Sequence, residues 1–391
     1  MHNKFIFNIF LYFYFICGVT YGIHDLNYVD EFGVALLAFY FLRKIFQWGY
    51  VPKPLKILGS FVIFYIVYSF FIEITVIPAI LQDAFQELKP FICFFCIYYL
   101  TPRFSSQEKK FLNRLSLICC LVCTAIWAFS GMSTAYELLI HPAYYGHIEL
   151  VSAILYLYTS PKGKKHIFVF LILLLMGIIC GRSKYYGEIV LAIFLFIFIK
   201  QRIRLNLKYI IYGAIVLILI LYVSWGKVSF YYSYVDEGAD AARPLLYIKS
   251  VDVFEDYFPW GAGLGTFGND ASRVYYSPLY DRYNLSSVYG LSRDFGNFIA
   301  DTYYPVIIAQ FGIIGILLFI SFFYFIIKRL SKFSLGVDDI NYKSGILMVA
   351  SLLIECFASP FLVTSMGTSL LSLLAIILSD MKLRSNNIKF I

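Results

Sequence analysis

Residues 227–270 read KVSFYYSYVDEGADAARPLLYIKSVDVFEDYFPWGAGLGTFGND, and residues 300–319 read ADTYYPVIIAQFGIIGILLF. Elsewhere, apolar blocks alternate with short basic connectors. Here roughly seventy residues stay outside the apolar pattern, far more than an ordinary connection between helices needs. Because the stretch carries Trp260, many tyrosines and the turn cluster PWGAGLG (259–265), we predict a large folded loop.

The composition places the whole chain in the membrane class. Of the 391 residues, 60% are hydrophobic and 14% are charged, and the mean hydropathy is +0.75. Soluble domains average about 25% charged residues, so a chain this apolar is expected to lie in a bilayer. We therefore predict an all-α polytopic membrane protein.

The apolar runs predict about twelve transmembrane helices, with the large loop before the tenth. A polar link through Asp83 and Glu87 leads into the fourth run. The predicted spans are 4–22, 32–48, 57–77, 85–101, 111–130, 143–159, 166–181, 187–200, 209–226, 302–327, 344–360 and 362–380.

The basic residues give this model its orientation. Lys and Arg concentrate in alternate connectors and in both chain ends, which the positive-inside rule places in the cytoplasm. The large loop then faces outward, and the net charge of +8 follows from topology rather than from nucleic-acid binding. The exceptions to the basic-inside pattern are Lys89, Arg182, Lys184, Lys227, Arg243, Lys249, Arg273, Arg282 and Arg293.

Three segments follow from this reading of the chain. Residues 1–226 hold the first nine spans, residues 227–300 the outer loop with short helices, and residues 301–391 the last three spans and a cytoplasmic tail. We find no internal repeat of the kind that marks inverted-repeat transporters, and no separable soluble domain with a core of its own. The loop is expected to depend on the bundle.

The cysteines predict neither a metal site nor disulfides in the loop. Cys93 and Cys96 have the CxxC spacing of a metal or redox pair, as do Cys120 and Cys123. Both pairs lie within apolar spans, where this spacing simply places two small residues on one helix face. We expect no metal and no cofactor.

Arg182 and Lys184 lie in the short outer link GRSKYYGE (181–188). One interpretation is a pair of snorkelling cations neutralised by Glu188 or by lipid phosphate. The other is a clamp for a phosphate group presented from the outer leaflet, with Arg182 giving bidentate geometry. Cations on the outer side are costly unless satisfied, which favours the clamp.

The loop offers two further candidates. Arg243 opens a short apolar helix that Pro244 starts, and a glycine turn follows at 261–265. That turn is a weak phosphate signal, and its alternative role is to let the backbone pass close to a neighbouring helix. Asp301, at the entrance to the tenth span, is either a helix cap or a carboxylate base at the membrane surface.

Three other titratable residues deserve mention. His141 and His147 lie near an outer connector, where a histidine is more often a structural donor than a catalyst. Glu73 is predicted inside the third span, and an acid there is a functional candidate.

Gly312 and Gly315 within the tenth span predict close helix packing.

Taken in order, these motifs resemble the O-antigen polymerase and O-antigen ligase superfamily of bacterial surface-polysaccharide assembly. The resemblance rests on GRSKYYGE (181–188), on ARPLLYIKSVDVFEDYFPWGAGLGTFGN (242–269) and on ADTYYPVIIAQFGIIG (300–315). It covers about residues 170–330, while the N-terminal half is similar in topology alone. Ligases of the family carry a His-Asn pair where this chain has Asp301-Thr302, which resembles the polymerase and capsule branches more.

The resemblance implies a glycosyltransferase whose donor is a sugar repeat unit linked through pyrophosphate to undecaprenol. Arg182 and Arg243 would hold the pyrophosphate, and Asp301 or His141 would position or deprotonate the acceptor hydroxyl. Trp260 and loop tyrosines would stack on sugars. The implied substrate-binding set is completed by Lys184, Lys249, Arg273 and Arg293.

Two other functions stay open at this point. A ligase of the same family would transfer finished polymer, and the missing His-Asn pair counts against it. A flippase for the lipid-linked sugar would need many charges lining a central cavity rather than a large outer loop. A polymerase in the bacterial cytoplasmic membrane would work beside flippase and chain-length regulator proteins.

Overall fold

The computed structural model describes residues 2–20, 28–139, 141–200, 242–335 and 339–388, with isolated positions between 201 and 241. Every regular element in these residues is a helix. In chain order they are α1 (His2–Leu11), η1 (Tyr12–Thr20), α3 (Val29–Trp48), α4 (Lys53–Ile72), α5 (Ile77–Leu100), α6 (Ser106–Leu139), α7 (Pro142–Thr159), α8 (Lys164–Met176), η2 (Gly177–Cys180), α9 (Ser183–Ile193), η3 (Phe194–Phe198), α11 (Ala242–Asp256), α12 (Asp270–Val274), α13 (Leu279–Arg282), α14 (Tyr304–Phe333), α15 (Ile340–Glu355), η4 (Phe361–Val363) and α16 (Ser365–Ile388).

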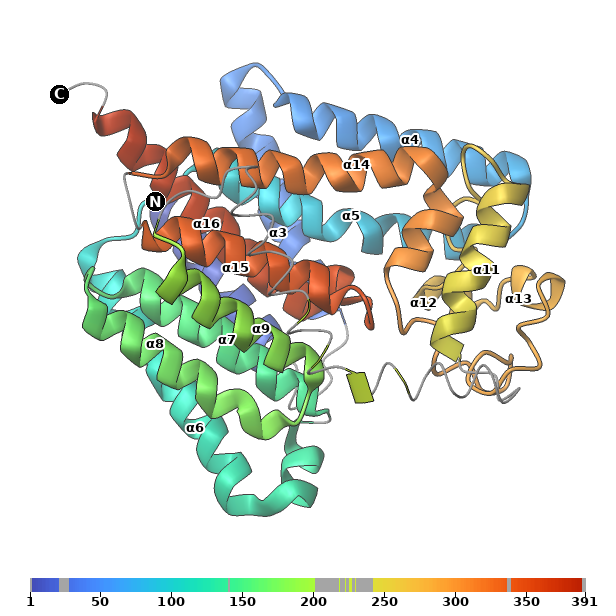
Figure 1. Cartoon of the computed structure of the whole chain (residues 1–391). Coiled ribbons are helices and arrows are strands. Elements are labelled where there is room, and N and C mark those ends of the chain that lie inside the picture. Colours follow the sequence, from blue (N-terminus) through green and yellow to red (C-terminus); the bar gives the residue numbers. More distant parts are fainter. Residues whose placement is uncertain are drawn as a thin grey trace.

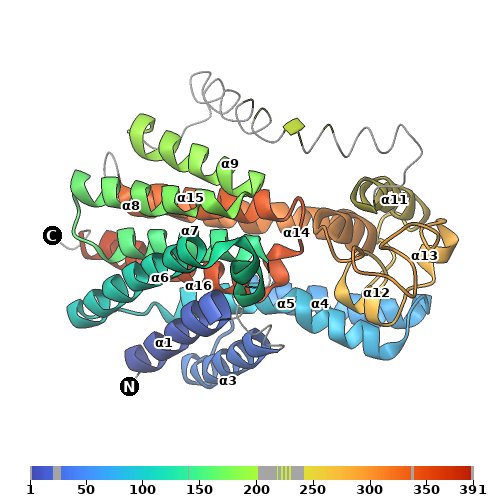
Figure 2. The same ribbon diagram turned by 90° about the horizontal axis from the view of Figure 1, so that it is seen from below.

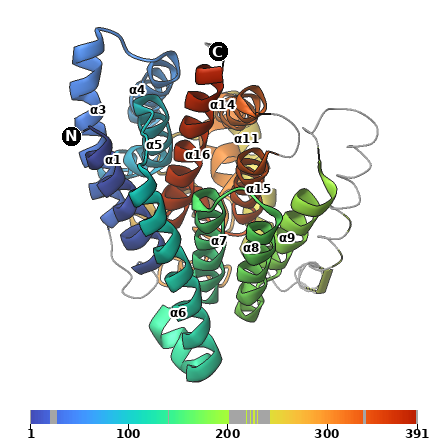
Figure 3. The ribbon, with the colours of Figure 1, turned by 90° about the vertical axis from the view of Figure 1, so that its left-hand side faces the viewer.

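The long helices form a bundle, and α11 to α13 cover one end of it (Figure 1). The start of α1 and the end of α16 lie at the opposite end, as the rotated view also shows (Figure 2). α16 lies inside the bundle and packs against α5 and η1. Viewed along the bundle, α1 and α3 lie on one side and α8 and α9 on the other (Figure 3).

Five helical segments in the described part of the chain are long and apolar enough to cross a membrane. They are His2–Thr20, Lys53–Ile72, Ser106–Gly131, Tyr304–Phe333 and Ser365–Asn386. Helices also occupy the other predicted spans that the structure describes. The predicted span 209–226 lies outside the described residues, apart from isolated positions.

Two predictions about acidic residues near α4 and α5 are wrong. Glu73 is not inside a span, because α4 ends at Ile72 and Glu73 is its exposed C-cap, with a left-handed φ of 51°. Asp83 and Glu87 do not form a polar link either. Both are buried within α5, which begins at Ile77.

The segment 242–303 contains most of a hydrophobic cluster that the sequence did not predict, to which Ala309 of α14 also belongs. Buried residues of α11, α12, α13 and the turns between them form one cluster, which includes Leu246, Phe267, Tyr280 and Leu291. The predicted helix after Arg243 is confirmed as α11. Burial of this apolar area stabilises the loop as a folded unit at the end of the bundle.

The glycine turn joins this unit to α14, as the close-approach interpretation predicted. Gly261 has a φ of 78°, and a Cβ there would lie 2.6 Å from the backbone of Gln310. Gly312 interrupts α14 with a φ of 51° and a ψ of −144°. Its predicted role in helix packing is therefore wrong, because the nearest atoms are the Pro259 carbonyl oxygen and the Gly261 nitrogen of the loop. Backbone hydrogen bonds from Ala262 and Gly263 to α14 complete the join.

Asp83 fastens the same turn to α5. Its carboxylate, fully buried, accepts hydrogen bonds from the Gly265 N–H at 2.7 Å, the Gln310 amide at 3.1 Å and the Asn269 amide. The Gln310 side-chain oxygen accepts in turn from the Thr266 N–H at 2.7 Å. Because buried donors must be paired, these bonds fix the turn against both helices.

We predict that Gly261→Ala destabilises the protein by at least about 3 kcal/mol, because a methyl group would overlap the backbone of α14 at a left-handed φ. The measurement is the thermal unfolding temperature in detergent. The control is Gly59→Ala in α4, where a Cβ meets nothing within 4 Å. Equal unfolding temperatures for the two variants would contradict the tight join.

Candidate functional site

Five of the residues selected from the sequence come together where α11 meets the bundle. His141 is the N-cap of α7, Arg182 is the N-cap of α9, and Lys184 lies in the first turn of α9. Arg243 lies in the first turn of α11, and Asp301 precedes α14. The charges of Arg182, Lys184 and Arg243 all act on His141, and those of Arg243 and Lys184 act on Asp301. We call these five residues the cationic cluster.

Helix termini place these side chains. Gly181, with a φ of 66°, ends the short helix η2 and turns the chain directly into α9. The N-termini of α7 and α11 each carry one histidine or cationic side chain of the cluster, and the N-terminus of α9 carries two. Since helix N-termini also carry partial positive charge, the arrangement favours a negatively charged ligand.

Arg243 and Asp301 form an ion pair of 2.9 Å across 58 residues of chain. The two side chains are 33% and 28% exposed, so a ligand can reach them. Burial raises the pKa of Asp301, and the nearby charge of Arg243 and then of Lys184 opposes that shift. Asp301 is therefore a stronger base than a free aspartate, held in place by an arginine.

Tyrosines hold this pair against α15. The Tyr247 hydroxyl of α11 donates to the Phe357 carbonyl at 2.8 Å, and the Tyr304 hydroxyl of α14 donates to the Leu353 carbonyl at 2.8 Å. The Tyr303 N–H also donates to the Cys356 carbonyl. Both members of the ion pair are thus fixed to the same helix end.

Lys184 binds Glu355, an acid that the sequence analysis did not select. The ammonium donates to the Glu355 carboxylate and, at 3.3 Å, to the Ser359 hydroxyl. The alternative interpretation had paired these cations with Glu188 or lipid phosphate, whereas the acid that Lys184 binds is Glu355. The signal that pointed to Glu73, an acid in an apolar run, was also present in LLIECF (352–357).

Arg182 approaches His141, with Nη2 3.0 Å from Nε2. Partial burial, and then the charges of Arg182, Lys184 and Arg243, lower the pKa of His141 to about 4, so the ring is neutral at pH 7. The Ala143 N–H lies 3.2 Å from Nδ1 and is also a donor. A neutral imidazole has one nitrogen that can accept a hydrogen bond, but here a donor faces each of the two ring nitrogens, so only one of the two bonds can form. An anion that draws Arg182 away would relieve this competition.

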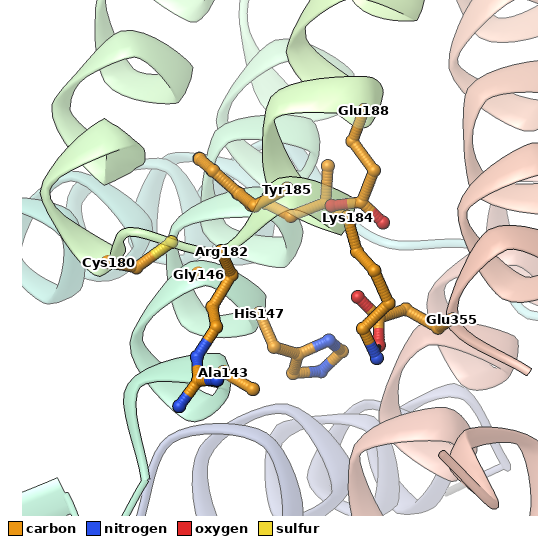
Figure 4. Close-up of a pocket in the computed structure, with 10 residues that line it drawn as sticks. Ala143, Gly146, His147, Cys180, Arg182, Lys184, Tyr185, Glu188 and Glu355 are labelled. Atoms are coloured by element: carbon orange, nitrogen blue, oxygen red, sulfur yellow. Dashed lines mark hydrogen bonds and ion pairs between the residues drawn. The ribbon is translucent and has the colours of Figure 1, made fainter. Parts of the chain in front are cut away.

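A small pocket lies beside Arg182 and Lys184 (Figure 4). Its wall includes His147, Glu188 and Glu355. His147 Nε2 and Glu188 Oε1 are buried and accept or donate no hydrogen bond within the described residues. Buried polar atoms without partners call for a water or a ligand group, which marks this pocket as polar and receptive.

The cluster carries more positive than negative charge. Its three cationic side chains, Arg182, Lys184 and Arg243, accompany one carboxylate of the cluster, Asp301, and the adjacent Glu355, while the His141 ring is neutral at pH 7. Arginines give bidentate hydrogen bonds to phosphate oxygens, and a lysine adds a point charge. The arrangement can hold a phosphate or pyrophosphate beside a carboxylate base.

The other four residues selected for substrate binding make their contacts outside the cationic cluster. All of them lie in the folded loop. Their contacts form the pairs Lys249–Asp252, Arg273–Asp270, Arg293–Tyr276 and Trp260–Phe64. Trp260 is 41% exposed, so its ring retains a free surface for stacking.

No protein-family model matches this sequence, and no curated protein matches it either. The resemblance to the polysaccharide superfamily therefore rests on the three sequence motifs alone.

We predict that an anion bound at the cluster raises the pKa of His141 from about 4, because a negative charge stabilises the imidazolium. The measurement is NMR of histidine-labelled protein titrated with acid, with and without inorganic pyrophosphate. The chain has five histidines, and His141→Asn assigns the signal. His166, bound to Tyr156 near the other end of α7, is the internal reference. An unchanged His141 titration would contradict anion binding here.

Proposed function

We propose that this protein is a polysaccharide polymerase that joins oligosaccharide repeat units linked through pyrophosphate to undecaprenol. The observation that carries the proposal is the meeting of Arg182, Lys184 and Arg243 with Asp301 beneath the folded loop. These residues come from segments far apart in the sequence. Three cations beside a carboxylate match what a pyrophosphate leaving group and an acceptor hydroxyl require.

In the proposed reaction, the growing chain is the donor and a new lipid-linked unit is the acceptor. A hydroxyl of the acceptor sugar attacks the anomeric carbon of the donor sugar, and its proton passes to the Asp301 carboxylate. The bond between that carbon and the pyrophosphate oxygen breaks, and the lipid pyrophosphate leaves with the electron pair. Arg182 and Arg243 bind the charge that develops on the leaving oxygens.

The ion pair of Arg243 with Asp301 has a place in this scheme. In the free enzyme, Arg243 donates to Asp301 at 2.9 Å. When pyrophosphate takes up the guanidinium, the carboxylate loses a partner that lowers its pKa, and its basicity rises. Donor binding would then prepare the base for the acceptor.

The proposal includes a topology of about twelve spans in the bacterial cytoplasmic membrane, with both termini cytoplasmic and the folded loop outside. The positive-inside distribution supports it. The start of α1 and the end of α16 both lie at the end of the bundle away from α11, which agrees with termini on the same side of the membrane (Figures 1 and 2). The polymer would be O-antigen, capsule or exopolysaccharide.

The experiment is to delete the gene and separate the surface polysaccharide of the cells on a gel. A polymerase predicts loss of the ladder, with single repeat units left. Finished chains that accumulate on lipid pyrophosphate would instead mean a ligase, and single units trapped on the cytoplasmic side would mean a flippase. Either of these outcomes would overturn the proposal.

A further inference from the structure

A second site lies in the bundle, in a groove between α4, α5 and α14. Its volume is about 460 Å³. The walls are mainly aliphatic and aromatic side chains, among them Phe61 of α4, Phe91 and Phe95 of α5, and Phe322 of α14. The function proposed above makes no use of this groove.

Cations surround one end of the groove. Lys53 and Arg329 line it, and Arg329 lies over the Phe325 ring at 5.1 Å. Lys382 of α16 lies 5.9 Å from the ring of Tyr99, which also lines the groove. In the described part of the chain, none of these three cations forms an ion pair with an acidic side chain. We call this end the cationic mouth.

The rest of the groove contains almost no charge. Among the described residues that line it, the one acidic side chain is Glu87, which is buried and accepts a hydrogen bond from the Tyr303 hydroxyl at 2.6 Å. Tyr303 precedes α14 and Arg329 lies near its end, so the cationic mouth is at the opposite end of α14 from Asp301. The two sites are therefore separate.

The groove is long enough for a lipid chain. On α5 its lining runs from Ala84 to Tyr99, and at 1.5 Å per residue this is about 22 Å. One leaflet of a bilayer has a hydrocarbon thickness of about 15 Å, half of the whole core. An acyl chain that enters beside the cationic mouth could thus lie along the groove over the thickness of one leaflet.

We propose that this groove binds one anionic phospholipid from the leaflet at the cationic mouth. The phosphate and its anionic headgroup lie against Lys53, Arg329 and Lys382, and one acyl chain follows the apolar walls toward Glu87. Charge complementarity selects an anionic lipid, because the mouth carries three cations and, among the described residues, no acid paired with them. Because the basic connectors lie at this end of the bundle, the positive-inside rule makes this the cytoplasmic leaflet.

The test uses the full-length protein purified in detergent and native mass spectrometry. Phosphatidylglycerol and phosphatidylethanolamine with identical acyl chains are added in equal amounts. We expect one phosphatidylglycerol to be retained in preference to phosphatidylethanolamine. The double variant Lys53→Gln, Arg329→Gln is expected to bind phosphatidylglycerol about 30-fold more weakly, since each cation near a membrane surface contributes about fivefold.

Two further variants complete the test. Ser321→Trp places a large ring in the groove and is expected to reduce retention of both lipids. Lys328→Gln removes one charge from an exposed residue that lies over Tyr324 and does not line the groove, and it is expected to bind lipid normally. Because the cation variants alter exposed or partly exposed side chains, their folding is expected to be normal.

Three results would overturn the proposal. They are equal retention of the two lipids, unchanged binding in the double variant, and co-purification of a polyprenyl diphosphate in the groove instead of a phospholipid. The last would show that the groove belongs to the polymerase substrate. Variants of the cationic cluster that lose chain growth but bind lipid normally would support the proposed function and leave the lipid proposal unchanged.

Discussion

Arg182→Ala and Arg243→Ala are each expected to stop polymer growth while the amount of protein in the membrane stays unchanged. In the proposed reaction each arginine stabilises charge on the departing pyrophosphate, and removal of one such donor costs about 100- to 1000-fold in rate. The measurement is the rate of chain growth by membranes that carry the variant as their only copy, supplied with lipid-linked repeat units. Arg243→Ala additionally removes the partner of Asp301.

The matched control is Arg282→Ala. Arg282 lies in the same folded loop, is 55% exposed, and pairs with Asp256 at 3.3 Å in a manner similar to the pair in the site. Its replacement is expected to leave chain growth within about twofold, because exposed ion pairs contribute little. Full-length polymer from Arg182→Ala membranes, or an equal loss in Arg282→Ala, would remove the arginines from the reaction.

Asp301→Asn is expected to reduce chain growth by about 100- to 10,000-fold, the range for loss of a general base. The amide keeps the size of the carboxyl group and can still accept from Arg243, so the fold and the site geometry are retained. Asp256→Asn is the control, since Asp256 is an exposed partner of Arg282 within the loop. The measurement is the same rate of chain growth in membranes.

The pH dependence provides an independent reading of Asp301. Burial raises its pKa above the ordinary aspartate value of 3.8, and only the ionised carboxylate can accept a proton. The rate of chain growth is therefore expected to fall as the pH drops through this raised pKa, and to reach its full value above it. In Asp301→Asn the residual rate should show no such acidic limb. A limb that persists unchanged in the variant would assign the base to another group.

The sequence predicted the helices well, because membrane helices follow from long apolar runs. Every predicted span that lies in the described part of the chain contains a helix. The helix after Arg243 was also predictable from Pro244 and its apolar positions. Boundaries were less accurate, since a cap such as Glu73 depends on one backbone angle that no apolar pattern encodes.

The site could be predicted in part. Arg182 and Lys184 stood out as cations on the outer side, but their distance from Arg243 and Asp301 depends on how the ends of α9, α11 and α14 pack together. Glu355 was missed although it lies inside the predicted span 344–360, because its partner Lys184 is 171 residues away in the sequence. The core of the loop was missed because residues such as Tyr276, Tyr280 and Leu291 have no regular spacing.

The bond from Gln310 to Asp83 has a consequence for the synthesis of the protein. The two residues are 227 positions apart, and the other partners of Asp83, Gly265 and Asn269, are also made late. At about 5 to 20 residues per second, Asp83 leaves the ribosome roughly 10 to 50 s before its last partner exists. During that time the Asp83 carboxyl has none of these partners, so it must stay in contact with water or be protonated. The hydrogen bonds of Asp83 can form only when the loop and the start of α14 have been made, so the C-terminal half of the chain completes the packing of α5.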